Sequence, residues 1–205
     1  MQARGKLFVI AAPSGAGKTS LVLALMKRLP ELRFSISYTT RQPREKEQNG
    51  VHYFFVDKEA FQRMKDRGEF LEHAQVFDNF YGTSKPQVEA LLDAGQNVLL
   101  EIDWQGAQQI RKAAPHVESI FILPPSRAEL ERRLRDRKTD SEEVIARRLR
   151  DSIADMSHWD EFDYVVVNRE FEQAVDELEA IVSGRGSNLK RDRAELKTLI
   201  GTLLG

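Results

Sequence analysis

The strongest constraint on the fold lies near the N-terminus, where an apolar run leads straight into a glycine-rich loop and a helical pattern. Residues 6–11, KLFVIA, have no polar alternation, which is typical of a fully buried β-strand. Residues 12–19, APSGAGKT, follow at once, and Leu21, Leu25 and Leu29 then fall on one face of a helix. This order of strand, loop and helix indicates an α/β protein.

The loop matches the spacing G-x-x-x-x-G-K-[ST] at Gly17, Lys18 and Thr19, with Ala12 in place of the first glycine. In such a loop, backbone N–H groups and a helix N-terminus cradle phosphate oxygens, the lysine reaches the phosphates, and the hydroxyl faces Mg²⁺. An ordinary glycine-rich turn is the alternative, but the flanking strand and helix favour nucleoside triphosphate binding. The predicted ATP-binding residues of this loop are Ala12, Pro13, Ser14, Gly15, Ala16, Gly17, Lys18, Thr19 and Ser20.

Three further apolar runs, at 97–103, 119–123 and 164–168, predict more buried strands that alternate with helices. The first of them ends on Glu101 and Asp103, and carboxylates at the carboxyl end of a parallel strand face the ligand crevice. We therefore predict a three-layer α/β fold of the P-loop NTPase type with a parallel central sheet.

Two segments interrupt this rhythm of strands and are predicted to be insertions. The first spans about 35–83 and includes the charged stretch 37–54, where Arg41 and Arg44 lie three residues apart. The second spans about 127–155 and is rich in arginine. Neither reads as a simple strand and helix of the sheet.

The arginine-rich segment has two interpretations. Its acidic residues favour a solvated helical hairpin with ion pairs for most of the arginines, and they argue against an RNA-binding role, which needs a net basic patch with stacking aromatics. Helical spacing places Arg133 and Arg137 on one face and Arg148 on a later helix. Two or three of these could bring cations to a transferring phosphoryl group from a mobile lid.

Composition excludes several classes of protein. A chain of 205 residues suggests one domain with inserted lobes, and 31 basic against 32 acidic residues give no global attraction to nucleic acid or membrane. The absence of cysteine and the scattered positions of four histidines leave no disulfide framework and no zinc site. No stretch resembles a signal peptide or an 18-residue apolar span, so we expect a cytoplasmic protein.

The C-terminal stretch carries an apolar helical stripe that needs a partner. Its members are Leu196, Leu199, Ile200, Leu203 and Leu204. The stripe can pack against its own core, or it can form a homo-oligomer contact.

Taken together, the motifs resemble those of the guanylate kinases, and specifically of the bacterial type. The resemblance runs from Lys6 to about Glu179 and rests on PSGAGKT, S-x-S-Y-T-T-R-x-P-R, NG-x-x-Y-x-F, FLEHAQVF, YGT, EIDWQGA and IFILPPS. It implies a core with the ATP site (1–34, 84–126 and 156–205), a GMP-binding lobe (35–83) and a lid (127–155). It also implies reversible transfer of the γ-phosphoryl group of ATP to GMP, and to dGMP, in purine nucleotide metabolism and GMP recycling, with Mg²⁺.

The resemblance also assigns roles to individual residues. In the lid and core, Arg137 and Arg148 would complete a charge clamp with Arg44, Asp103 would lie near the substrate and the magnesium water shell, and Asn168 would lie beside adenine. The residues that would hold the GMP phosphate are Arg41, Arg44, Tyr53 and Tyr81. Those that would read guanine are Ser37, Glu72 and Thr83, because a carboxylate can accept from both N1–H and N2–H of guanine, whereas adenine offers no such pair of donors.

Four positions depart from the family pattern without removing a proposed contact: Lys46, Glu101, Lys138 and Arg169. Two alternatives within related folds stay in view. A non-catalytic interaction module would not need Lys18 together with the lid arginines, and a kinase for another nucleoside monophosphate would not need Glu72 with Ser37.

Overall fold

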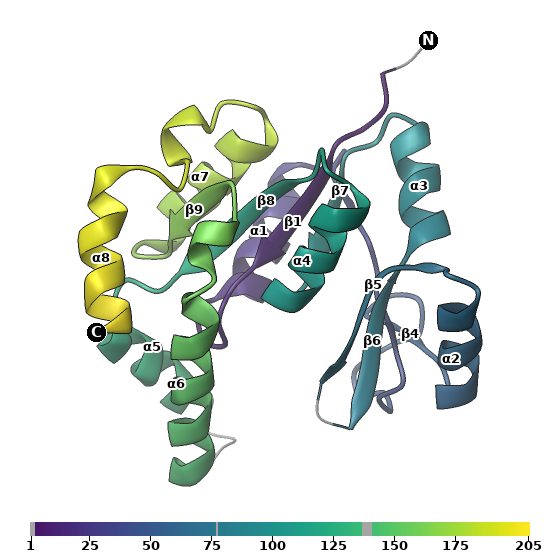
Figure 1. The fold of residues 1–205 in the computed structure, drawn as a ribbon, viewed down its shortest axis with the longest axis horizontal. Helices are drawn as coiled ribbons and strands as arrows, with labels where there is room; N and C mark the ends of the chain where they lie inside the picture. The colour runs from purple at the N-terminus through teal and green to yellow at the C-terminus, as the bar shows by residue number, and fades with distance from the viewer. Residues whose placement is uncertain (1–2, 77, 137–140) are drawn as a thin grey trace. The chain divides into compact units, whose positions relative to one another are not determined.

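The computed structural model describes residues 3–76, 78–136 and 141–205. Two compact units are formed by packing, and each is described by itself (Figure 1). The first unit holds the N-terminal residues to Leu7 with Glu31–Leu100 and Gln105–Val117. The second holds Phe8–Pro30, Glu101–Trp104 and Glu118–Gly205. The division predicted from the sequence into core, lobe and lid concerns function rather than packing, and it stays a prediction.

The central sheet is parallel in each described pairing of β1 with β8, β8 with β9 and β2 with β7, as the sequence predicted. The strand order is β2-β7-β1-β8-β9. The bounds are β1 Leu7–Ala11, β2 Arg33–Phe34, β7 Val98–Glu101, β8 Glu118–Leu123 and β9 Tyr164–Val167. The α/β class is confirmed, and the strands β1 and β8 are buried almost throughout.

Helices connect and follow the strands of the second unit. They are α1 Lys18–Arg28, α5 Arg127–Arg135, α6 Glu142–Met156, α7 Phe171–Val182 and α8 Ala194–Leu204, with 3₁₀ turns η1 Trp159–Glu161 and η2 Ser187–Leu189. Helix α1 packs against α7, where Arg28 bonds Glu172 at 2.6 Å and also bonds Asp176. Phe121 and Phe162 meet in the core with ring centroids 4.9 Å apart. This packing holds the loop between β1 and α1 on a rigid base.

The apolar stripe of α8 packs within its own unit. Leu196, Leu199, Ile200 and Leu203 are each 9% exposed or less in the single chain, and α8 lies beside α6 (Figure 1). Arg127 Nε donates to the carbonyl of Leu203 at 2.6 Å, which satisfies one of the unpaired carbonyls at the end of the helix. Of the two options open from the sequence, packing on the core therefore accounts for most of the stripe.

The first unit contains a four-stranded sheet in the order β4-β3-β6-β5. Its elements are β3 Tyr38–Thr39, β4 Phe54–Phe55, α2 Lys58–Asp66, β5 Phe70–Val76, β6 Asn79–Ser84 and α3 Lys85–Asp93, and most of α4 Trp104–Ala113 belongs to the same unit. Phe61 of α2 stacks on Phe70 and Phe80 of the sheet at 4.5 and 5.6 Å between ring centroids. Gly82 leaves room for these rings, because a Cβ there would lie 2.9 Å from Phe70.

Among the described residues, no helix combines the length and apolar character needed to cross a bilayer.

Candidate active site

The loop after β1 has the geometry of a phosphate cradle. Gly15 and Gly17 adopt left-handed φ values of 89° and 93°, and the N–H of Ala16 closes a turn on the carbonyl of Pro13 at 3.2 Å. A Cβ at Gly17 would lie 2.6 Å from Asn168 Nδ2, so this position needs glycine for both conformation and space. Ala12 continues directly from β1, and α1 begins at Lys18 as the motif requires.

Lys18 lies near three acidic residues. Its Nζ donates to the carbonyl of Ile102 at 2.8 Å. Burial lowers the pKa of Lys18, while the nearby charges of Glu101, Asp103 and Asp155 act in the opposite direction. The ammonium is thus held at the carboxyl end of β7, which is where the sequence placed the ligand crevice.

Thr19 and Glu101 form the part of the site that suits a divalent cation. Thr19 Oγ1 donates to Glu101 Oε1 at 2.6 Å. In the part of the chain that the structure describes, no group of three or more His, Cys, Asp or Glu side chains could hold a metal ion by itself. One hydroxyl and one carboxylate instead fit Mg²⁺, which keeps several waters and is commonly bound together with substrate phosphates.

Asn168 contacts the phosphate loop. It is 4% exposed, and its Nδ2 donates to the carbonyl of Ala16 at 2.8 Å. Arg133 of α5 joins the same group, because its guanidinium donates to the carbonyls of Ala16 and Asn168 at 3.2 and 3.1 Å. From the sequence, Arg133 was predicted only to lie on one face of a helix. Its partner Glu129, four residues earlier and 2.7 Å away, was the only local signal.

The ion-pair interpretation of the arginine-rich segment is confirmed for three arginines. Arg132 and Arg133 pair with Glu129, and Arg135 pairs with Glu131 on the same helix at 2.8 Å. Arg148 lies half-buried on α6. Arg137, like the departure Lys138, lies outside the described residues.

The first unit brings together most of the residues assigned to the GMP phosphate. The guanidinium carbon of Arg41 lies 5.5 Å from the ring centroid of Tyr53, and Tyr53 meets Tyr81 edge to face at 6.1 Å. A hydrogen bond that Arg41 donates to the Tyr81 oxygen contributes to the raised pKa of Arg41, whose largest cause is its hydrogen bond with Glu47. Arg44 is exposed at the edge of this cluster.

Glu47 was not among the site residues predicted from the sequence. Its carboxylate accepts from Arg41 Nη2 at 2.8 Å and from the backbone N–H of Arg44 at 2.7 Å. These hydrogen bonds, with Arg41 first, lower the pKa of Glu47 to about 2. Glu47 lies in the charged stretch 37–54, where a carboxylate is expected to be solvated. Its contacts with Arg41 and Arg44 depend on the conformation of the turn, which the sequence does not reveal.

Glu72 and Thr83 face each other inside the small sheet. Thr83 Oγ1 donates to Glu72 Oε1 at 2.6 Å, and the two residues are 1% and 5% exposed. They are register partners of β5 and β6. Ser37 precedes Tyr38, whose register partner Gly82 adjoins Thr83. Glu72 is therefore a buried carboxylate of this sheet and not a surface one.

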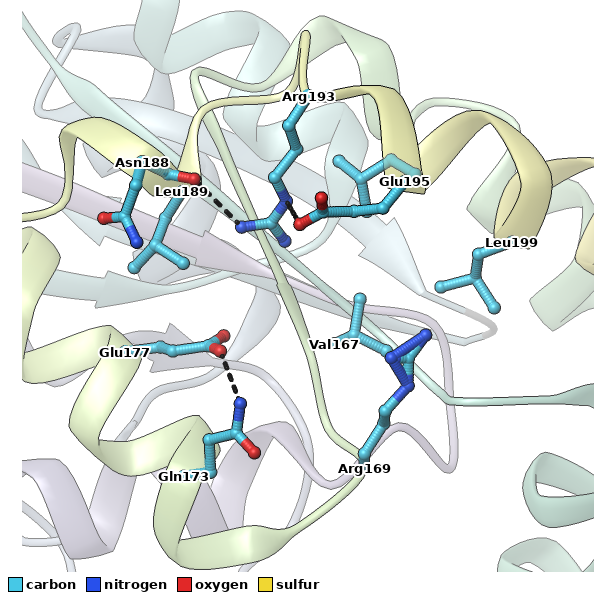
Figure 2. A pocket seen from close by; sticks show the side chains of 10 residues that line it. Val167, Arg169, Gln173, Glu177, Asn188, Leu189, Arg193, Glu195 and Leu199 are labelled. Atoms are coloured by element: carbon cyan, nitrogen blue, oxygen red, sulfur yellow. Dashed lines mark hydrogen bonds and ion pairs between the residues drawn. The ribbon is translucent and has the colours of Figure 1, made fainter.

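A pocket of about 200 Å³ in the second unit lies among β9, α7, η2 and α8 (Figure 2). Arg169, Glu177 and Arg193 line it, and Gln173 bonds Glu177 at 3.2 Å. Arg169 thus lines this pocket, so its departure from the family pattern adds a charge here. None of the loop residues 12–20 lines it.

A parallel sheet, a glycine-rich loop after β1, a lysine at the first residue of α1 and carboxylates after β7 define a P-loop nucleotide-binding enzyme. A profile of the guanylate kinase family matches residues 4–185, and the chain belongs to that family.

Guanylate kinases of other organisms align with this chain over nearly its whole length. The guanylate kinase of Chromohalobacter salexigens is 52% identical over 201 residues, which cover 98% of this chain and 94% of that protein. The guanylate kinase of Escherichia coli strain K12 is 51% identical over 204 residues, which cover 98% and 99%. The crystal structure of guanylate kinase from Anaplasma phagocytophilum superposes with a TM-score of 0.74 at 34% identity and covers 98% of this chain and 95% of that one.

The resemblance inferred from the motifs is confirmed. The chain is a kinase, an ATP-dependent phosphotransferase that converts GMP to GDP.

Proposed function

We propose that the chain transfers the γ-phosphoryl group of ATP reversibly to GMP, and also to dGMP, with Mg²⁺, and so serves purine nucleotide metabolism and GMP recycling in the cytoplasm. The observation that carries the choice of GMP is the buried Glu72–Thr83 pair on the same small sheet as Tyr81, which meets Tyr53 beside Arg41. The carboxylate of Glu72 can accept from the two donors of guanine, and Arg41 with the two tyrosines can bind a phosphate dianion.

We assign each substrate to the segments and side chains whose chemistry suits it. Residues 1–34, 84–126 and 156–205 would hold ATP, residues 35–83 would hold GMP, and residues 127–155 would act as the lid. Arg41, Arg44, Tyr53 and Tyr81 would bind the GMP phosphate. Ser37, Glu72 and Thr83 would read guanine, and Asp103 would orient substrate and the water shell of the metal.

The reaction needs no general base, because the GMP phosphate is already an oxyanion at neutral pH. The residues of this chain would align that oxyanion with the γ-phosphate and neutralise charge as it develops. Lys18 would supply the cation from the core, and Arg137 and Arg148 would supply cations from the lid. Mg²⁺, held at Thr19 and through water at Glu101, would neutralise phosphate charge when bound.

The test is ADP release with ATP and a panel of nucleoside monophosphates. We expect turnover with GMP and dGMP, and a kcat/KM for AMP, CMP and UMP that is lower by at least about a hundredfold. Equal rates across the panel would indicate another monophosphate kinase. No release with any of them would indicate an interaction module.

Glu47 should position the phosphate-binding arginines. Glu47→Gln should raise the KM for GMP by about tenfold with a smaller change in kcat, because Arg41 and the backbone of Arg44 lose a charged acceptor. The exposed Glu45→Gln is the matched control, and steady-state kinetics measure both. The lowered pKa of Glu47 means that its stabilisation is present above pH 4.5 and is lost as the pH falls toward 2, so the KM for GMP should show no titration of this group between pH 5 and 9. An unchanged KM in Glu47→Gln would refute the role.

A homo-oligomer through α8 is the remaining proposal on partners. It would have to use the exposed residues Lys197, Thr198 and Thr202 with the half-buried Leu204, because the other members of the stripe are buried in the chain itself. Light scattering should then give a mass above 23.5 kDa that falls in Thr198→Glu. A wild-type mass of one chain would exclude it.

A further inference from the structure

Helix α6 carries three polar side chains along one face. Arg148, Ser152 and Asp155 are spaced i, i+4 and i+7, so their side chains project from the same side of the helix. The first of them is the proposed lid cation. The other two have no place in the function described so far.

Ser152 ties α6 to the phosphate loop. It is fully buried, and its Oγ donates to the carbonyl of Ser14 at 3.0 Å. Ser14 lies inside the glycine-rich loop, between Pro13 and Gly15. This contact therefore fixes the distance between the middle of α6 and the loop that cradles phosphate.

Asp155 ties the end of the same helix to the segment after β7. The indole Nε1 of Trp104 donates to Asp155 Oδ1 at 3.0 Å, and Trp104 directly follows Asp103. The indole ring of Trp104 also stacks on His158, with ring centroids 3.5 Å apart and planes inclined by 9°. His158 is fixed in turn by Glu161 at 2.6 Å and by its own N–H to the carbonyl of Asp155 at 3.2 Å.

Partial burial of the Asp155 carboxylate costs free energy, so packing alone does not explain an acid at this position. Burial raises the pKa of Asp155, with Asp103 and Asp151 adding to the effect, and the bond from Trp104 opposes it. A half-buried acid near other acids contributes less to stability than an apolar side chain of similar size. The hydrogen bond between Asp155 and Trp104 does, however, join the helix that carries Arg148 to the segment that carries Asp103.

We propose that Asp155, through Trp104, and Ser152, through Ser14, are positioning residues that anchor α6 on the ATP site and so determine where Arg148 meets the transferring phosphoryl group. This inference rests on the proposed function for the role of Arg148. It adds an anchor of two hydrogen bonds on one helix face to that function.

Kinetics of matched variants test the anchor. Asp155→Ala and Trp104→Phe should each lower kcat by about tenfold, with KM values for ATP and GMP within about twofold of wild type, because substrate binding does not use these groups. Ser152→Ala should lower kcat by about threefold. Arg150→Ala, on the opposite face of α6, is the control and should leave kcat unchanged.

Two comparisons separate positioning from other roles. Asp155→Asn keeps an oxygen that accepts from the indole and loses the charge, so it should retain at least about half of the wild-type kcat. In an Arg148→Ala background, Asp155→Ala should cause no further loss of kcat, since both changes remove the same interaction. An Asp155→Asn variant as slow as Asp155→Ala, or full additivity with Arg148→Ala, would overturn the proposal.

Stability gives a readout that does not depend on turnover. Thermal unfolding of Trp104→Phe, Asp155→Ala and the double variant should show coupling between the two sites, and additive shifts in Tm would refute the anchor. If Asp155→Ala does not fold, Trp104→Phe carries the kinetic test, because its ring can still stack on His158. A wild-type enzyme without GMP-dependent turnover would instead refute the proposed function.

Discussion

Lys18→Met should abolish turnover, with kcat lower by at least about a thousandfold, while the protein stays folded. Lys18 directly follows Gly17 of the glycine-rich loop, and its Nζ bonds the carbonyl of Ile102 at 2.8 Å. Phosphoryl transfer is accelerated mainly by charge placed around the transferred group, and methionine has similar length but no charge. ADP release at saturating ATP and GMP measures the effect.

The fold should survive because Lys18 is a polar group of the site rather than a core residue. Burial already lowers its pKa, so the removal of the charge relieves a desolvation cost while it leaves one carbonyl without its donor. We expect Tm to change by no more than a few degrees. Lys27→Met, an exposed lysine on the same helix, is the control and should be fully active. More than about a tenth of wild-type activity in Lys18→Met would contradict the assignment of the loop.

The elements that the sequence predicted best are those whose signals are local. The strand, loop and helix at 6–29 follow from an apolar run, positive-φ glycines and a leucine spacing, and each of these needs only neighbours along the chain. The family resemblance followed from several such local motifs together.

The contacts that the sequence did not predict join residues distant along the chain. Ser152 and Ser14 are 138 positions apart, and Trp104 and Asp155 are 51 apart. No periodicity encodes such pairs, because they depend on where a helix end meets a loop after the sheet has formed. Glu47 is a different case, since it lies only six residues from Arg41 but needs the conformation of an irregular turn.

In each of the two units, one cation that we propose to bind phosphate already has an internal partner. Arg41 is bonded to Glu47, and Lys18 is bonded to a carbonyl and lies near three acidic residues. A cation that is paired in this way avoids part of the desolvation penalty and is held in position. Phosphate oxygens can then use the donors that remain, since guanidinium and ammonium groups each have several.

Base selection should rest on Glu72. If Arg41, Arg44 and Tyr53 hold a phosphate, they accept any nucleoside monophosphate, so discrimination must come from elsewhere. Glu72 is buried in the small sheet, with Thr83 Oγ1 donating to its Oε1 at 2.6 Å. Its carboxylate would accept the N1–H and N2–H of guanine, whereas with AMP it would face the N1 acceptor and a C–H. A buried charge left without such donors costs on the order of 2–4 kcal/mol, which excludes AMP by at least about a hundredfold.

Glu72→Ala should therefore weaken GMP strongly and compress the GMP-to-AMP ratio of kcat/KM by at least about tenfold, chiefly through the loss of GMP. The KM for ATP should stay near normal, because Lys18 and its loop are unchanged. Glu59→Ala, a side chain that is 88% exposed on α2 in the same unit, is the control for a lost carboxylate. The measurement is kcat/KM for both monophosphates in wild type and each variant. A Glu72→Ala enzyme with the wild-type ratio would show that this carboxylate does not read the base, and recognition of guanine would have to lie with Ser37, Thr83 or Asp103.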